Sequence, residues 1–406
     1  MNNQQKAFNK LSRLKVGALF MEMGTGKTKV ALDLIASKKN KVDYILWVCP
    51  YSLKTEIETE KYKWHDELEL DIVGVESIGS SDRIFLETLE KVKSHKTFMV
   101  VDESLKIKNR RAKRTERILM MGEMSQYRLI LNGTPVARNI LDLWTQMEFL
   151  SPKILDMDFY EFKDTYTEYY TQGRLKGLVK RQCNIEHLIS KIEPYIFNCD
   201  LDLNAKKHYY SYSYSMSPEE RDKYEFQKYC ILAESDEEDR IDFYRLISVL
   251  QSIFTDAEDR KRLLQSIETD GQAVVFVKYL KSIPEGELSI TGDMNSDERR
   301  KAIMRFKNKE SKYLYITYGC GAYGLNLQFC NNMIFLDHSF DYSQRVQAEA
   351  RIYRMGQEED VNYYSLYCDV GLEDMIRRSL DKKTNLLNDV KKEIDKRGLK
   401  EWAKTI

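Results

Sequence analysis

The segment 22–28 (EMGTGKT) contains the residue types that bind a nucleotide phosphate. Gly24 and Gly26 can adopt backbone angles that wrap a phosphate, with their N–H groups pointing inward. Lys27 would supply a positive charge to the outer phosphates, and the Thr28 hydroxyl suits Mg²⁺. The segment follows an apolar run and precedes a helical pattern, as this chemistry requires. A glycine turn next to a chance Lys-Thr pair is the alternative. The predicted nucleotide-binding residues here are Met23, Gly24, Thr25, Gly26, Lys27 and Thr28.

Two acidic residues, Asp102 and Glu103, follow the apolar run 98–101. Carboxylates at the end of a buried strand are costly unless they have a function. In a phosphate-loop enzyme the first holds Mg²⁺ through water and the second polarises the attacking water. A third apolar run ends in a polar turn at 129–135 (LILNGTP), which can sense the nucleotide, and Thr134 in this turn is a candidate for coupling or DNA contact. A plain turn is the alternative for this third segment.

Arginines gather on a predicted helix in the second half of the chain. Gln347, Arg351 and Arg354 are spaced at i, i+4 and i+7 in the segment 342–357, so they would share one helical face. Exposed arginines on a helix usually keep it soluble. This spacing also places two guanidinium groups where they could meet a γ-phosphate across a cleft, as an arginine finger does.

Positive charge is concentrated in one segment, although the whole chain is balanced at 64 basic and 64 acidic residues. Between 106 and 117, seven Lys and Arg residues stand against one acid. Lys106, Lys108 and Arg110 follow the catalytic acids directly, which predicts contacts with a DNA backbone. A solvated helix face is the alternative.

The elements that must position these residues alternate between apolar and helical patterns, which predicts an α/β fold with parallel sheets. The expected strands are 16–20, 44–49, 71–75, 97–102, 128–131, 273–277, 313–317, 333–336 and 362–367. The expected helices include 27–37, 83–94, 296–307 and 342–354. The alternation of Tyr and Ser at 208–215 predicts a half-buried strand, with a base-stacking platform as the alternative.

This pattern divides the chain into four predicted regions. Residues 1–150 form a nucleotide-binding lobe, 151–265 a mostly helical insertion, 266–370 a second lobe and 371–406 a helical C-terminal segment. No apolar stretch is long enough to span a membrane, and the N-terminus lacks the apolar core of a secretory signal. The seven cysteines are scattered and form no C-x-x-C pair, which favours a cytoplasmic protein without a zinc site.

In this order, the segments resemble the motifs of the Swi/Snf family of superfamily 2 helicase-like ATPases over nearly the whole chain. The general phosphate-loop pattern, G-x-x-x-x-G-K-[ST], would place a glycine at position 21, where this chain has Met21. The first motif of the family begins without that glycine, so the resemblance accounts for Met21. The matching segments are MEMGTGKT (21–28), LWVCPYSL (46–53), DESLKIKN (102–109), LNGTPVARNILDLW (131–144), SITGDMNSDERRKAIMRF (289–306), GLNL (324–327) and QAEARIYRMGQ (347–357).

The resemblance implies two RecA-like lobes with ATP and Mg²⁺ between them, moving along duplex or branched DNA without sequence preference. Gln5 would read adenine, and Gly324 and Gln347 would face the nucleotide. Lys27, Asp102, Glu103, Arg351 and Arg354 would be catalytic, with Thr28 and Asp102 at the metal.

One position departs from the family pattern: Leu105 replaces the usual histidine, which puts the coupling of hydrolysis to motion in doubt. The compact chain is similar to minimal bacteriophage and bacterial members, so replication or recombination proteins are expected partners. A strand-separating helicase and a DNA- or replisome-binding module with little turnover are the alternative functions.

Overall fold

The computed structural model describes residues 2–133, 140–169, 179–201, 203–233, 243–321, 325–340, 342–354, 356–382, 402, 405 and 406. The chain forms two compact units, residues 1–202 and 203–406. Each unit contains one six-stranded sheet whose neighbouring strands are parallel. The predicted α/β class with two RecA-like lobes is therefore confirmed.

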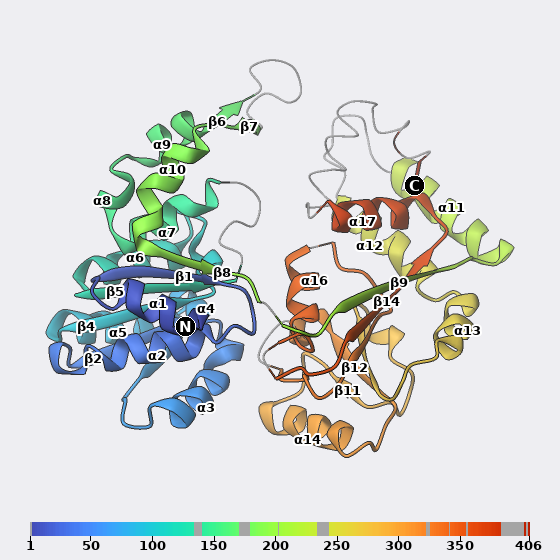
Figure 1. Cartoon of the computed structure of the whole chain (residues 1–406). Helices are drawn as coiled ribbons and strands as arrows, with labels where there is room; N and C mark the ends of the chain where they lie inside the picture. Colours follow the sequence, from blue (N-terminus) through green and yellow to red (C-terminus); the bar gives the residue numbers. More distant parts are fainter. Residues whose placement is uncertain are drawn as a thin grey trace. The chain divides into compact units, whose positions relative to one another are not determined.

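The sheet of the first unit has the strand order β3-β2-β4-β5-β1-β8 (Figure 1). Its strands are β1 (Val16–Met21), β2 (Tyr44–Cys49), β3 (Asp71–Gly74), β4 (Thr97–Asp102), β5 (Tyr127–Asn132) and β8 (Ile196–Cys199). The helices of this unit are α1 (Asn3–Leu11), α2 (Lys27–Ala36), α3 (Lys54–Trp64), α4 (Val75–Ser80), α5 (Asp82–Ser94), α6 (Lys113–Met124), α7 (Asp142–Leu150), α8 (Pro152–Leu155), α9 (Phe159–Tyr166) and α10 (Ile185–Ile192). A separate hairpin pairs β6 (Thr167–Tyr169) with β7 (Val179–Gln182).

Two apolar cores cover the two faces of this sheet. On β1, Ala18 and Phe20 pack in the core shared with α4, α5, α6 and α7, whereas Leu19 and Met21 pack in the core shared with α1, α2 and α3. Since successive side chains of a strand point to opposite faces, a strand buried on both faces is apolar throughout. Polar residues are therefore confined to the strand ends, and the carboxyl ends of the neighbouring strands β4, β5 and β1 lie along one edge.

The sheet of the second unit has the order β11-β12-β10-β13-β14-β9. Its strands are β9 (Lys207–Tyr214), β10 (Ala273–Val277), β11 (Ser289–Ile290), β12 (Tyr313–Thr317), β13 (Asn332–Phe335) and β14 (Val361–Cys368). Its helices are α11 (Pro218–Ala233), α12 (Phe243–Phe254), α13 (Glu258–Ser266), α14 (Ser296–Lys307), α15 (Tyr318–Gly321), α16 (Tyr342–Glu349) and α17 (Gly371–Asp381). One core packs α11, α12, α13 and α17 against β9, β10 and β14.

The segment 151–265, predicted as a mostly helical insertion and linker, contains helices α8 to α13 and also contributes a strand to the sheet of each unit. Strand β8 is an edge of the first sheet and β9 is an edge of the second. Strand β8 has only four residues (IFNC), with a mixed burial pattern, so no apolar run marked it in the sequence. The strand predicted at 208–215 is confirmed as β9.

The C-terminal segment begins with α17, which lies within the predicted helical region 371–406. Residues 383–401 of that region lie outside the described residues. Within the described part of the chain, none of the helices combines the length and apolar character needed to cross a membrane.

Candidate active site

The phosphate-loop sequence forms a tight connection between β1 and α2. Gly24 and Gly26 have φ angles of 82° and 85°, in the left-handed region that glycine adopts without strain. Gly26 is the N-cap of α2 and supplies no side-chain cap, so the first N–H groups of this helix remain available to an anion. The Thr25 hydroxyl donates to the Glu22 carbonyl at 2.6 Å, which closes the loop. The loop therefore has the shape of an anion-binding turn.

Lys27, the first residue of α2, has a buried ammonium group. Its Nζ has no hydrogen-bond partner among the residues that the structure describes. It reaches the end of β5, because a Cβ atom added to Gly133 would lie 3.5 Å from this Nζ. A buried cation without a partner is costly, so this atom indicates that an anionic group belongs in the loop. The predicted phosphate contact of Lys27 fits this geometry.

Asp102 ends β4 and is buried, with 8% of its surface exposed. Burial, followed by the charge of Glu103, raises the pKa of Asp102 to about 7, and the charge of Lys27 acts in the opposite direction. A cation next to this carboxylate would favour its ionised form. The first unit thus brings together Lys27, Asp102 and Glu103, three of the predicted catalytic residues.

Glu103 has a φ angle of 50°, which is unusual for a residue with a side chain. Its backbone N–H donates to Asp102 Oδ1 at 2.9 Å, and it precedes the short 3-10 helix η3 (Ser104–Ile107). Such a conformation costs about 1–3 kcal/mol and persists where the surrounding contacts enforce it. The chain therefore turns sharply after Asp102, which ends the strand with two consecutive carboxylates.

A buried polar network holds this turn, and sequence reasoning missed it. The Ser104 hydroxyl donates to Gln146 Oε1 at 2.6 Å and accepts from Asn132 Nδ2 at 3.3 Å. Gln146 Nε2 in turn donates to the Asp142 carbonyl at 2.8 Å within α7. The ends of β4 and β5 and the helix α7 are thereby connected. Because Gln146 is 42 residues from Ser104, no local pattern pointed to it.

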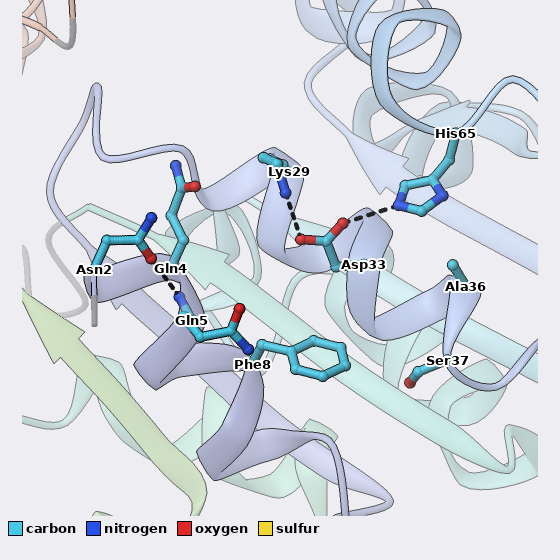
Figure 2. A pocket seen from close by; sticks show the side chains of 9 residues that line it. All are labelled: Asn2, Gln4, Gln5, Phe8, Lys29, Asp33, Ala36, Ser37 and His65. Atoms are coloured by element: carbon cyan, nitrogen blue, oxygen red, sulfur yellow. Dashed lines mark hydrogen bonds and ion pairs between the residues drawn. The ribbon is translucent and has the colours of Figure 1, made fainter.

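A pocket of about 410 Å³ lies beside the loop, between α1, α2 and the end of α3 (Figure 2). Gln5, the predicted adenine reader, lines it, and its Nε2 donates to Asn9 Oδ1 at 3.1 Å. Gln4 connects the pocket to the phosphate loop, since its Nε2 donates to the Thr25 carbonyl at 3.2 Å. The complete lining is Asn2, Gln4, Gln5, Phe8, Lys29, Asp33, Ala36, Ser37 and His65.

The arginine face predicted on one helix in the second unit is wrong. Helix α16 ends at Glu349, so Gln347 is helical whereas Arg351 and Arg354 follow in turns. The Arg351 carbonyl accepts from the Leu327 N–H at 3.1 Å, a hydrogen bond outside the helix. Arg351 is 5% exposed, and its Nη1 lies 3.5 Å from the Leu325 carbonyl.

Arg354 is partly exposed and is the more accessible of the two predicted finger residues. Arg345, which does lie on α16, has a structural role. It lies over the Phe335 ring at 3.3 Å and pairs with Glu349 at 2.7 Å. Thr134, predicted to serve coupling or DNA contact, and Gly324, predicted to face the nucleotide, lie outside the described residues.

The basic segment divides into two parts in the structure. Arg117 is buried and donates to the Ile78 carbonyl and to Asp82, so it holds α6 in place. The Arg110 guanidinium carbon lies 4.4 Å from the centroid of the Phe159 ring, and Arg110 Nη2 donates to the Tyr160 hydroxyl at 3.0 Å. Burial removes Arg117 from any surface contact, whereas Lys106, Lys108 and Arg110 are partly exposed, and their predicted DNA contact stays a prediction beside the solvated-face alternative.

Two parallel-sheet lobes, one of them with a phosphate loop facing a pair of strand-end carboxylates, define a helicase-like nucleotide-binding protein. The family model described as SNF2-related domain matches residues 7–259, and the model described as helicase conserved C-terminal domain matches residues 257–356. The chain belongs to the SNF2-related family. This membership places it among the helicase-like ATPases.

Curated relatives share about a quarter of the aligned residues. The SWI/SNF chromatin-remodeling complex subunit snf22 of Schizosaccharomyces pombe is 25% identical, over 89% of this chain and 26% of the relative. The transcription regulatory protein SNF2 of Saccharomyces cerevisiae is 23% identical, over 91% of this chain and 26% of the relative. The chain thus spans about a quarter of the length of these relatives.

Among solved structures, the Sulfolobus solfataricus SWI2/SNF2 ATPase core in complex with dsDNA is similar to this chain. It is 23% identical, with a TM-score of 0.43, over 99% of this chain and 96% of the other. The ATPase core domain from the same organism has the same TM-score, with 22% identity over 95% of this chain and 89% of the other.

The buried charge of Asp102 leads to a prediction about stability. Its pKa is about 7 in the folded protein, above its ordinary value of 3.8, so its ionisation on going from about pH 4 to pH 7 destabilises the fold. Without nucleotide or Mg²⁺, Asp102→Asn should raise the free energy of unfolding by about 1–3 kcal/mol at pH 8. The gain should disappear near pH 3, below the ordinary pKa of 3.8, where the acid is mostly protonated in both states. Chemical denaturation at both pH values measures it, and equal gains at both would contradict the assigned cause.

Proposed function

We propose that this protein is an ATP-driven motor that moves along duplex or branched DNA. The observation that carries the proposal is the buried Lys27 ammonium, which has no hydrogen-bond partner among the described residues and lies near the carboxylates at the end of β4. Such a group is matched by a nucleotide phosphate. Membership of the SNF2-related family supports ATP as the nucleotide.

Different residues of the first unit are proposed to bind the phosphates, the base and the metal ion. Gly24, Gly26 and Lys27 bind the phosphates, and Gln5 contacts the base. Thr28 and Asp102 would hold Mg²⁺, which would supply neutralisation of the phosphate charge. Within the described residues, no group of three His, Cys, Asp or Glu side chains is arranged to hold a metal ion, so water and phosphate oxygens would complete its coordination.

Glu103 is the proposed general base. Its backbone position next to Asp102 directs it to the same edge of the sheet, and it is partly exposed, so it can reach a water molecule. Arg351 and Arg354 are proposed to stabilise the charge that develops on the transferred phosphate. Gln347 and Gly324 are proposed to line the same site from the second unit.

DNA is the proposed track. Curated relatives are named as subunits of chromatin-remodeling complexes, and chromatin is DNA packed with protein. Lys106 and Lys108 supply positive charge just after the catalytic acids and are proposed to contact the backbone. We further propose a cytoplasmic role in phage or bacterial replication, recombination or repair, with proteins of those processes as partners.

The first prediction from this proposal concerns turnover. The purified chain should hydrolyse ATP in the presence of Mg²⁺, and duplex DNA of any sequence should increase the rate. Glu103→Gln should keep ATP affinity within about threefold and lower the rate by about 10²–10⁴-fold, because the water loses its base. A coupled phosphate-release assay measures the rate. An ATP hydrolysis rate that does not change when duplex DNA is added would contradict the proposed DNA motor. A wild-type rate in Glu103→Gln would contradict the role of Glu103 as the base.

The same preparation separates the alternative functions. A motor that moves on duplex should leave forked DNA strands paired while it displaces a streptavidin block from the duplex. A strand-separating helicase would release the labelled strand of the fork. A binding module would retain DNA without measurable turnover.

A second prediction concerns Arg354. An arginine finger contributes about 10³–10⁵ to the rate, because it acts on the transition state and not on the bound nucleotide. Arg354→Ala should therefore lower DNA-stimulated hydrolysis by at least about 10³-fold with little change in ATP affinity. Arg300→Ala, at an exposed position on α14, is the matched control. Full activity in Arg354→Ala would remove this residue from the site.

A third prediction tests the DNA interface. Lysines that bind phosphates release counterions, so the logarithm of affinity should fall steeply with the logarithm of salt concentration. Replacing Lys106 and Lys108 with Gln should reduce that slope by about 0.9 for each phosphate that the protein no longer neutralises. Lys153→Gln, at an exposed position on α8, controls for general loss of positive charge. An unchanged slope in the double variant would exclude these two lysines from the DNA interface.

A further inference from the structure

His65 connects two carboxylates at the wall of the pocket in the first unit. Its Nε2 lies 2.9 Å from Asp33 Oδ1, and its Nδ1 lies 2.9 Å from Glu67 Oε1. A neutral imidazole has one N–H donor, so it could donate to only one of these carboxylates and would present a lone pair to the other. The imidazolium form donates to both. The geometry therefore fits a protonated His65.

The second oxygen of Asp33 extends this connection along α2. Asp33 Oδ2 accepts from Lys29 Nζ at 2.8 Å, across one helical turn. Lys29, Asp33 and His65 all line the pocket, and Figure 2 shows the chain of contacts between them. The Lys29 ammonium also lies 5.0 Å above the ring of Trp64, the last residue of α3. One continuous set of charged contacts thus joins α2 to the end of α3.

The surroundings of His65 determine how its charge depends on pH. Burial lowers the pKa of His65, but the hydrogen bonds that its ring donates to Asp33 and Glu67 and the charges of both carboxylates outweigh burial, so the pKa lies above its ordinary value. Asp33 faces it from α2 and Glu67 from its own loop, while Lys39 of the 3-10 helix η1 (Lys39–Lys41) lies 3.5 Å from the Glu67 carbonyl. The hydrogen bonds to both carboxylates are therefore complete below about pH 6.5 and weaken as the pH rises through the raised pKa.

We propose that protonated His65 is a positioning residue for the nucleotide, holding Asp33 and Lys29 in the pocket wall so that nucleotide affinity falls when His65 loses its proton. The inference rests on the proposed function, since the pocket would hold the nucleoside part of ATP. Gln4 supports this placement, because it lines the pocket and donates to the phosphate-loop carbonyl of Thr25.

Two physical effects connect the proton to affinity. The charges of Lys29, Asp33, His65 and Glu67 sum to zero when His65 is protonated and to −1 when it is not, and the extra negative charge repels an anionic nucleotide. A neutral ring also releases one of the two carboxylates. If Asp33 is released, Lys29 loses the geometry that directs its remaining N–H groups toward the pocket.

The test is calorimetric titration of MgADP into the full chain between pH 6.5 and pH 9. Pyrophosphate is titrated in parallel, because it reaches the phosphate loop but not the pocket. Wild-type affinity for ADP should fall about three- to tenfold over this range relative to pyrophosphate. His65→Gln should bind ADP with the weaker affinity at all pH values.

Glu67→Gln provides the more discriminating variant, because Glu67 is outside the pocket and exposed. Without its charge, the fall in ADP affinity should begin at a lower pH than in wild type. Glu168→Gln is the matched control, since it makes the same chemical change in an ion pair with Arg181 on the hairpin. Its profile should superimpose on that of wild type.

Each outcome decides between the two claims. If ADP binds and the wild-type, Glu67→Gln and Glu168→Gln profiles coincide, the role of His65 is refuted while the nucleotide site stands. If ADP and pyrophosphate show the same dependence on pH, the effect belongs to the phosphate loop and the role of His65 is again refuted. If ADP does not bind at any pH, the proposed function fails, and the inference fails with it.

Discussion

The electrostatics of one sheet edge govern the first unit. Lys27 has a buried ammonium, and Asp102 has a buried carboxylate whose pKa is raised to about 7. Burying both groups is unfavourable without a ligand, and the two apolar cores on the faces of the sheet leave this edge as the place where polar groups collect. The fold therefore holds in advance the charges that a phosphate and a cation would neutralise.

The contacts around this edge explain how the costly arrangement persists. Glu103 keeps its unusual φ angle because η3 begins directly after it and Ser104 is fixed by Gln146 and Asn132. In the family pattern a histidine two residues after the second acid is held to couple hydrolysis to motion, and Leu105 occupies that place here. Leu105 has no polar side-chain atom, so its side chain cannot make a hydrogen bond there. The neighbouring Ser104 connects the end of β4 to β5 instead, through its hydrogen bond with Asn132.

The sequence predicted the elements whose pattern is local. The apolar runs predicted most strands of both sheets, and the loop glycines and strand-end acids predicted the candidate phosphate site. Features that depend on distant contacts were not predictable. Strand β8 is short and partly polar, α16 ends at Glu349 before the two arginines, and His65 contacts two carboxylates that come from different elements. Of the contacts around His65, only the Lys29–Asp33 ion pair could be predicted from sequence spacing, because the two residues stand at i and i+4 of one helix.

The most direct test of a phosphate site at this edge replaces Lys27 by Met, which has a similar volume and no charge. Calorimetry with MgATP and thermal unfolding without ligand should be measured on wild type and on Lys27→Met. ATP affinity should fall at least about tenfold, a loss of about 1.4 kcal/mol, because the phosphates lose their buried cation, and thermal unfolding without ligand checks that the variant is folded. Unchanged ATP affinity in a folded Lys27→Met protein would contradict the phosphate site.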